Sequence, residues 1–258
     1  MSFIKSEEEV ELLRASNLLV SRTLGMLAGY IRPGISTLEL DELAETYIRD
    51  NGGTPGFKNY NGFPSTLCTS VNEAVVHGIP SGYCLRDGDI ISVDCGVILD
   101  GYYGDSAFTF PVGEVDSKVI RLLEVTRESL EAGVRAAVAG NRVGDISYAV
   151  QTVAEKAGYS VVRELVGHGI GKRLHESPEV PNFGRRGAGP KLDKGVVICI
   201  EPMINMGRRD TIQCGDGWTV KTVDGKHSAH FEYAVAVDRG KADVLTTFEF
   251  IDNVLSKK

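Results

Sequence analysis

The stretch Leu85-Arg86-Asp87-Gly88-Asp89-Ile90-Ile91-Ser92-Val93-Asp94 returns in pattern 107 residues later, as Leu192-Asp193-Lys194-Gly195-Val196-Val197-Ile198-Cys199-Ile200-Glu201. Each copy reads leucine, two polar residues, glycine, an apolar run typical of a buried strand, and then an acid. The same order of features in both places predicts an internal duplication.

Two further echoes point the same way. Ser36-Thr37-Leu38 opens one amphipathic helix, and Asp145-Ile146 opens another about 108 residues later, each with a capping hydroxyl or carboxylate. His77-Gly78-Ile79 is echoed by His168-Gly169-Ile170 at a different offset, which implies a loop of changed length. Three echoes in one order favour a duplication over chance.

Each half is predicted to begin with helices and to continue with strands. Apolar residues recur at spacings of three and four over residues 7–31, 37–51, 117–139 and 145–157. Strand and hairpin signals follow in each half, which favours an α+β fold of antiparallel sheet covered by helices. No Pro-, Gly- or Ser-rich linker is present, so we predict one domain over residues 1–258. Its halves would be about 1–113 and 114–258, sharing one continuous sheet system.

Composition excludes several classes of protein. The chain has 258 residues, 42% of them hydrophobic, and a net charge of −7, which argues against wholesale nucleic-acid binding. Arg185-Arg186 and Arg208-Arg209 read as solvated loops or as local basic patches. The N-terminus is acidic without an apolar core, and the apolar run 196–200 is too short to span a bilayer. An odd cysteine count without CxxC spacing predicts reduced thiols in a cytoplasmic protein.

A hairpin is predicted to bring two acids together. Residues 90–98 and 102–110 are strand-like, and Asp100-Gly101 between them is a two-residue turn signal. In that register Asp94 opposes Ala107, and Asp105 lies two residues along the same face. The two Cα atoms would be roughly 7–8 Å apart, so both carboxylates could reach one ion. The alternative is a pair of solvated acids, which the apolar neighbours disfavour.

Three further polar residues stand in strand-like or glycine-lined segments. Glu201 ends an apolar strand before Pro202, and Glu232 lies inside the strand-like run 230–235. Such acids are costly to bury unless they are paired in salt bridges or bound to metal. His168 lies in Gly167-His168-Gly169-Ile170-Gly171, which lacks the spacing and the Ser or Thr of a phosphate-binding loop.

Charge favours metal as the partner of this set. Four ionised carboxylates would repel by about 4 kcal/mol per close pair at an effective dielectric constant near 20. Two divalent cations cancel the four charges, and a neutral imidazole completes the ligands. Mainly oxygen ligands with one imidazole suit Mn, Fe, Co or Zn, and a metal pair can activate water for hydrolysis.

Several strings together resemble the type I methionine aminopeptidases. They are 72-NEAVVHGIP-80, 93-VDCG-96, 104-GDS-106, 167-GHGIG-171, 175-HESP-178, 200-IEPM-203 and 231-FE-232. The resemblance covers essentially the whole chain and implies the pita-bread fold, with two pseudo-symmetric halves around a dinuclear metal centre. It implies hydrolytic removal of the initiator methionine from nascent proteins with a small second residue, through a water bridging two divalent metals.

The resemblance also implies roles for individual positions. The metal ligands would be Asp94, Asp105, His168, Glu201 and Glu232, and Glu201 would also shuttle a proton to the leaving amine. His77 and His175 would contact substrate and intermediate. The methionine pocket would be lined by Tyr60, Phe63, Cys68 and Trp218. Leu174 and Phe57 depart from residues common in the family, and Asn72 and Ser228 match a monovalent-cation site of some members.

Other interpretations stay open. Proline-specific pita-bread peptidases share the five ligands but usually carry an additional N-terminal domain, for which His77 lies too near residue 1. A non-catalytic pita-bread binding protein is the other alternative, which intact ligands disfavour. Partners would be the N-termini of nascent polypeptides and, because of the arginine pairs, the ribosome. We expect a monomer that binds neither membrane nor specific nucleic-acid sequences.

Overall fold

The computed structural model describes residues 4–257 of the chain. The helices are α1 (Glu7–Ala28), α2 (Thr37–Asp50), α3 (Ser117–Ala136), α4 (Val143–Lys156) and α5 (Glu249–Leu255), with a short 3-10 turn at Tyr60–Gly62. The N-terminal strands are β1 (Thr54–Pro55), β2 (Leu67–Val71), β3 (Ala74–Val76), β4 (Ile90–Leu99) and β5 (Tyr102–Pro111). The C-terminal strands are β6 (Ser160–Val161), β7 (Gly167–Gly169), β8 (Glu176–Val180), β9 (Val197–Ile200), β10 (Met203–Asn205), β11 (Thr211–Gln213), β12 (Val220–Thr222), β13 (Ser228–His230), β14 (Tyr233–Ala236) and β15 (Asp243–Val244).

The long helices occur where apolar spacing predicts them, but some boundaries differ: α1 and α3 each end three residues earlier than predicted, at Ala28 and Ala136. Ser36 caps α2 as expected: its Oγ accepts from the Glu39 N–H at 3.2 Å, and the Glu39 carboxylate accepts from the Ser36 N–H at 2.8 Å. Helix α4 instead begins at Val143, two residues before Asp145. The Asp145 carboxylate accepts from the Arg142 N–H at 2.8 Å, so it closes the first turn from inside the helix.

The predicted hairpin register is confirmed. In the β4–β5 ladder Asp94 pairs with Ala107 and Asp105 pairs with Gly96. Asp100 and Gly101 form the turn with φ of 50° and 79°. Positive φ at both central positions is the type I′ geometry that Asp-Gly favours. Asp94 and Asp105 therefore lie on one face of the hairpin.

The two halves repeat one arrangement of strands. Strand β4 pairs with β5 on one edge and with β1 and β2 on the other, while β9 lies between β14 and β7. The strands of the duplicated stretches are thus the central strands of the two larger sheets. The third echo does not mark equivalent positions in the two halves. His77 follows β3, which pairs with β12, whereas His168 lies in β7, which pairs with β9.

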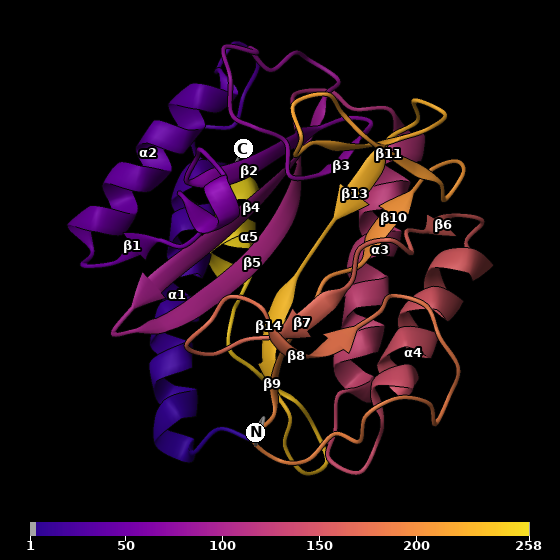
Figure 1. Ribbon diagram of the computed structural model, residues 1–258. Helices are drawn as coiled ribbons and strands as arrows, with labels where there is room; N and C mark the ends of the chain where they lie inside the picture. The colour runs from indigo at the N-terminus through magenta and orange to yellow at the C-terminus, as the bar shows by residue number, and fades with distance from the viewer. Residues whose placement is uncertain (1–3, 258) are drawn as a thin grey trace.

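The expectation of one continuous sheet is also wrong, because the described ladders form four sheets. The halves meet where β5 runs beside the β13–β14 segment, in the centre of Figure 1. The Glu232 N–H donates to the Ala107 carbonyl at 2.9 Å, and Ser106 Oγ donates to the Glu232 carbonyl at 2.7 Å. We call these contacts, together with those of Thr109 and His230, the seam.

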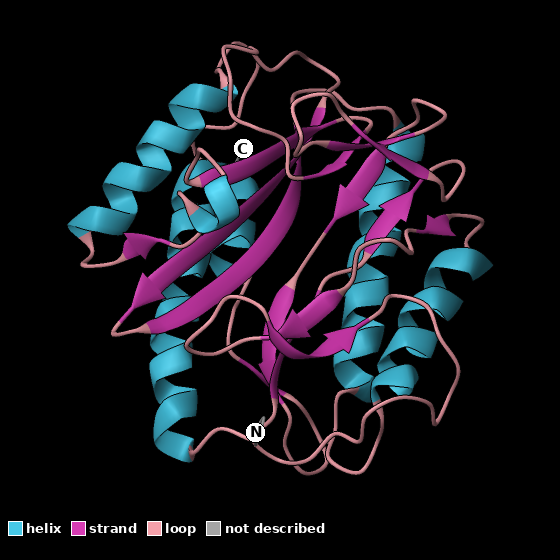
Figure 2. Ribbon diagram, viewed as in Figure 1, coloured by secondary structure: helices cyan, strands magenta, loops and turns pink. Residues whose placement is uncertain are grey.

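Helices cover the outer faces of the sheets, as Figure 2 shows. Helices α1 and α2 pack on the N-terminal strands, α3 and α4 on the C-terminal strands, and α5 packs against α1. The core crosses the seam: the Phe108 ring lies 4.8 Å from the Phe231 ring and 4.9 Å from the Phe248 ring. Within residues 4–257, none of the helices has the length and apolar composition needed to cross a membrane.

Candidate functional site

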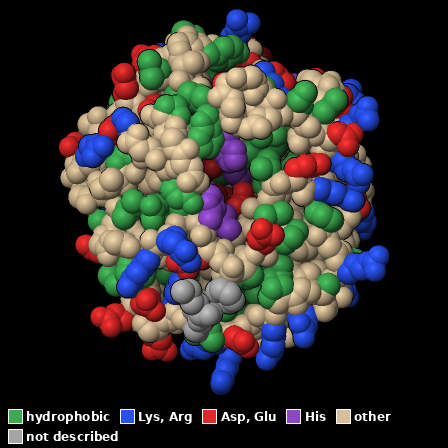
Figure 3. All heavy atoms as spheres, in the orientation of Figure 1, with side chains coloured by type: hydrophobic (Ala, Val, Ile, Leu, Met, Phe, Trp, Pro, Cys, Tyr) green, Lys and Arg blue, Asp and Glu red, His purple; other side chains and the backbone are tan. Residues whose placement is uncertain are grey.

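One cavity of about 390 Å³ opens between the halves and collects every residue predicted for metal or substrate. Figure 3 shows it as a hollow in the molecular surface, with histidine and acidic side chains inside and apolar side chains around it. The predicted residues on its wall are Tyr60, Phe63, Cys68, His77, Asp94, Asp105, His168, His175, Glu201, Trp218 and Glu232. Their roles stay predictions, but their convergence is a property of the fold.

The four acids reach the cavity from the central strands and the seam. Asp94 lies on β4 and Asp105 on β5, whereas Glu201 follows the last residue of β9. Glu232 lies in a break between β13 and β14, so the expectation that it sits inside a continuous strand is wrong. The β9–β14 ladder ends at Ile200 and Tyr233, and the next residue in each direction is an acid that turns to the cavity.

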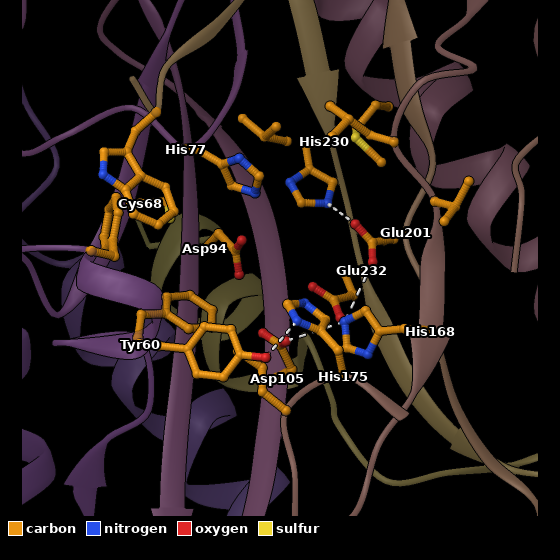
Figure 4. Close-up of a pocket in the computed structure, with 18 of the residues that line it drawn as sticks. Tyr60, Cys68, His77, Asp94, Asp105, His168, His175, Glu201, His230 and Glu232 are labelled. Carbon is orange, nitrogen blue, oxygen red and sulfur yellow. Dashed lines mark hydrogen bonds and ion pairs between the residues drawn. The ribbon is translucent and has the colours of Figure 1, made fainter. Parts of the chain in front are cut away.

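His168 stands against two of these acids. Its Nε2 lies 3.7 Å from Asp105 Oδ2 and 3.6 Å from Glu201 Oε1, as Figure 4 shows. Its Nδ1 lies 3.0 Å from the Gly169 carbonyl oxygen, which favours a proton on Nδ1 and leaves Nε2 as a lone-pair donor. A metal-binding histidine typically donates its other ring N–H to a carbonyl in this way.

Burial opposes ionisation of the acids. It raises the pKa of Asp94 to about 6 and the pKa of Asp105, Glu201 and Glu232 well above their usual range, and neighbouring carboxylates raise the latter three further. Burial also lowers the pKa of His168 to about 4, which keeps its ring neutral. At neutral pH the acids therefore favour a cation as partner.

The donor set fits divalent metal. Asp94 Oδ1, Asp105 Oδ1 and Glu232 Oε1 are buried and have no hydrogen-bond partner within residues 4–257. Ligand atoms of Asp105, His168, Cys199 and Glu232 all lie within 4.8 Å of one another. Carboxylate oxygens left without donors, beside a neutral imidazole, are the chemistry that a divalent ion satisfies.

Two more histidines face the acids from the cavity wall. His77 has a φ of 58°, a left-handed conformation that is uncommon outside glycine and recurs at functional sites. The neighbouring Gly78 allows this turn, because a Cβ there would overlap the Thr69 carbonyl. His175 lies edge-on to His168, with ring centroids 4.4 Å apart, and its Nδ1 is 3.0 Å from Tyr60 Oη. Burial lowers the pKa of His77 to about 4.

The remaining wall is apolar. The Phe63 and Trp218 rings meet edge-on at 5.1 Å, and buried Cys68 lines the same end of the cavity. Phe57 and Leu174 also line the cavity. A wall that combines acids and histidines with aromatic, thiol and aliphatic groups suits a substrate with one polar end and one apolar side chain.

The chain is similar in sequence and structure to known metallopeptidases. Residues 11–239 match the profile of metallopeptidase family M24. The methionine aminopeptidase of Clostridium perfringens (strain 13 / Type A) is 49% identical over 246 residues, which cover 95% of this chain and 99% of that protein. The chain belongs to the methionine aminopeptidases of family M24. A crystal structure of methionine aminopeptidase from Rickettsia prowazekii matches at a TM-score of 0.93 and 41% identity, covering 95% of this chain and 99% of that one.

Proline-specific peptidases resemble the chain less closely than methionine aminopeptidases do. The Xaa-Pro dipeptidase from Bacillus anthracis shares the fold at a TM-score of 0.77, but it is only 22% identical, and this chain covers 62% of its length. That likeness shows the fold alone. Near full-length matches at close to half identity favour methionine aminopeptidase over a proline-specific enzyme.

Sequence reasoning missed two polar residues of this M24 site. Cys199 stands two residues before Glu201, and its Sγ falls within the compact group of ligand atoms. His230 stands two residues before Glu232, and its Nε2 lies 3.6 Å from Glu201 Oε2. Alternation along a strand could have signalled both, because residues i and i+2 share a face.

The predicted monovalent-cation residues do lie together. The Ser228 N–H donates to the Asn72 carbonyl at 2.9 Å. The Asn72 side chain is engaged locally, since its Oδ1 accepts from the Ile90 N–H at 3.0 Å and its Nδ2 donates to Asp89 at 2.8 Å. A cation there would use backbone carbonyl oxygens more than the amide, and this site stays a prediction.

Proposed function

We propose that this methionine aminopeptidase removes the initiator methionine from nascent polypeptides whose second residue is small. The observation that carries the proposal is the single cavity, which joins a cluster of buried carboxylates and imidazoles to an apolar wall. The 49% identity to a protein named methionine aminopeptidase, over 95% of this chain, also supports the proposal. We further propose that residues 1–258 act as one catalytic domain, because both halves line the cavity.

We assign metal binding to five residues: Asp94, Asp105, His168, Glu201 and Glu232. Two divalent ions, drawn from Mn, Fe, Co and Zn, would neutralise the four carboxylates and, when bound, supply an activated water and polarise the scissile carbonyl. Asp94, Asp105 and Glu232 would help to hold these ions through their carboxylate oxygens. The orphaned carboxylate oxygens support this assignment.

Glu201 is our candidate for proton transfer. Its side chain is 14% exposed, against 5% for Asp105, so its carboxylate has more access to the cavity. Burial and the nearby Asp94 carboxylate raise its pKa well above its usual range, which favours its holding a proton. It would take a proton from the attacking water and pass it to the leaving amine.

His77 and His175 would hold the substrate backbone and the developing negative charge. Tyr60 Oη forms a hydrogen bond with His175 Nδ1, which leaves His175 Nε2 free to contact the substrate. Tyr60, Phe63, Cys68 and Trp218 would enclose the methionine side chain, since aromatic rings and a thiol pack well against a thioether.

A peptide-cleavage panel tests the function. The metal-loaded protein should release methionine from Met-Gly and Met-Ala peptides, and should cleave Met-Leu and X-Pro peptides much more slowly. Faster cleavage of X-Pro peptides would favour the proline-specific alternative. Absence of cleavage with Mn, Fe, Co and Zn alike would favour a binding protein.

The partner proposal extends to the ribosome and the cytoplasm. Arg185, Arg186, Arg208 and Arg209 are exposed, and the described cysteines are all free thiols, as a reducing compartment requires. Arg208 and Arg209 each approach Asp210, which weakens that pair as an anion site. A monomer that cosediments with ribosomes at low salt and dissociates at high salt is expected, and salt-independent absence of binding would contradict ribosome docking.

A further inference from the structure

His230 is held rigidly at the seam. Its N–H donates to Thr109 Oγ1 at 2.9 Å, and Thr109 Oγ1 donates to the His230 carbonyl at 2.7 Å. Thr109 Oγ1 is itself 2.8 Å from Ser92 Oγ on β4. The residue is 1% exposed, and these contacts hold its backbone in place at the seam.

The His230 ring faces Glu201. Nε2 is buried and has no hydrogen-bond partner within residues 4–257, and Glu201 Oε2 is 3.6 Å away. Figure 4 shows the ring between His77 and Glu201, on the opposite side of the Glu201 carboxylate from His168. The gap exceeds the usual 2.7–3.2 Å hydrogen-bond range by about half an ångström, which a small side-chain rotation closes.

The two Glu201 oxygens therefore have different neighbours. Oε1 lies 3.6 Å from His168 Nε2, on the side of the compact ligand group, and Oε2 lies 3.6 Å from His230 Nε2. His230 therefore approaches the Glu201 oxygen that is not the one beside His168. This placement suits a hydrogen-bond donor to a ligating carboxylate rather than a further ligand.

We propose that His230 is a positioning residue whose Nε2–H donates to Glu201 Oε2 and thereby turns Oε1 toward the metal cluster. The inference rests on the proposed function, which makes Glu201 both ligand and proton carrier. Without this donor the carboxylate could rotate about its terminal torsion, because that torsion is broad in acidic side chains. A buried imidazole donor without an acceptor would also be costly, which gives the pairing its driving force.

Ring-proton NMR tests the hydrogen bond without relying on activity. In protein labelled with ¹⁵N-histidine, we expect a slowly exchanging Nε2–H resonance that disappears in His230→Gln and shifts in Glu201→Gln. His227→Gln is the matched control, because His227 lies three residues away and does not line the cavity; it should leave that resonance in place. Absence of the resonance, or no shift in Glu201→Gln, would overturn the hydrogen bond.

Kinetics and metal binding separate positioning from ligation. His230→Leu should lower kcat for a Met-Gly peptide by about 10- to 100-fold, the usual range when a hydrogen bond to a metal ligand is lost, with KM within about twofold. His230→Gln keeps an N–H donor and should recover most of kcat. Mn²⁺ affinity by calorimetry and the Co²⁺ absorption spectrum should match wild type in His230→Gln. A changed Co²⁺ spectrum or a tenfold loss of Mn²⁺ affinity in that variant would make His230 a ligand instead.

The measurements also separate this inference from the proposed function. If wild type cleaves no peptide, the proposed function fails, while the NMR resonance still decides the His230 contact. If wild type is active and His230→Leu keeps full kcat with a normal melting temperature, the positioning role is wrong and the proposed function stands.

Discussion

At the scale of single residues, the site is defined by acids that the fold buries, although burial disfavours their ionised form. Asp105 and Glu232 are 4% and 2% exposed, yet oxygen atoms of both have no hydrogen-bond donor in the described chain. An uncompensated buried charge is among the costliest features of a protein interior. Such residues persist where function requires them, and a divalent cation supplies the missing compensation.

Neutral amides should therefore remove catalysis and keep the fold. We expect Asp94→Asn and Glu201→Gln each to lower kcat by at least about a hundredfold, because each would remove a proposed metal ligand and Glu201 is also the proposed proton carrier. Peptide turnover with added Mn²⁺ measures the loss, and circular dichroism checks the fold. Asp100→Asn in the turn of the same hairpin is the control and should retain full activity. Retained turnover in either site variant would contradict the assignment.

Asp41 provides a residue-scale test of pH dependence away from the cluster. This residue of α2 is 6% exposed, and it accepts from the Leu67 N–H at 2.7 Å, beside the cavity residue Cys68. Burial raises its pKa from 3.8 to about 6. The folded state then holds a proton that the unfolded state releases, so the stability from this group is full at low pH and is lost as the pH rises from about 4 to 6.

Replacing Asp41 by Asn should remove that loss, because the amide keeps the acceptor and carries no charge. The free energy of unfolding of Asp41→Asn relative to wild type should rise between pH 4 and pH 7, by at most about 3 kcal/mol. Urea denaturation at several pH values measures it. Asp41→Ala lacks the acceptor and should be less stable than Asp41→Asn throughout. A pH-independent difference between Asp41→Asn and wild type would contradict the raised pKa.

At the scale of elements, the seam between β5 and the β13–β14 segment sets the geometry of the site. Neither strand pairs with the other in a regular ladder; single side chains and backbone groups join them instead. At the break formed by Phe231 and Glu232, the Glu232 side chain lines the cavity. The Glu232 N–H donates a hydrogen bond to the Ala107 carbonyl. Glu232 thus reaches the cavity from the two residues between β13 and β14.

Thr109 is the side chain on which the seam depends most directly. Thr109→Val should destabilise the protein by about 2–5 kcal/mol, because the buried His230 N–H and carbonyl would both lose their partner. It should also lower kcat, since His230 and Glu232 would shift. Thr109→Ser keeps the hydroxyl and should lose far less of both. Chemical denaturation and peptide kinetics test the pair, and equal stability of the two variants would contradict this role of the hydroxyl.

At the scale of the whole molecule, the cavity exists because two similar halves face each other. Asp94 lies on central strand β4, and Glu201 follows the end of central strand β9. Helices cover the outer faces of both halves. Binding of cations between the halves should therefore stabilise the whole fold, because it removes repulsion among acids drawn from both.

Metal removal should expose that coupling. Chelation should abolish peptide cleavage reversibly, with recovery on addition of Mn, Fe or Co. At metal concentrations about a hundredfold above Kd, binding adds about 2.7 kcal/mol of stability, which corresponds to roughly 5–10 °C in melting temperature for a domain of this size. Thermal denaturation with and without Mn²⁺ measures the shift, which should shrink in Asp94→Asn. Full activity of a metal-stripped preparation would refute a metal-dependent enzyme.

Local chemistry determined much of this protein from sequence alone. The Asp100-Gly101 turn set the β4–β5 register, because only a few turns permit positive φ at two successive residues, and the register placed Asp94 and Asp105 on one face. Apolar spacing and the Ser36 cap similarly defined α2. The family was also readable, because seven short strings carry its pattern.

Only the tertiary structure decided what depends on contacts between distant segments. The break before β14, the four separate sheets and the topological difference between His77 and His168 all follow from how the halves meet. The local signal for Cys199 and His230 was weak, only a spacing of two residues from Glu201 and Glu232, because each becomes a site residue only when the seam brings β9, β5 and β13 together. Turns and helices obey short-range sterics, whereas a cavity between two halves obeys packing across more than a hundred residues of chain.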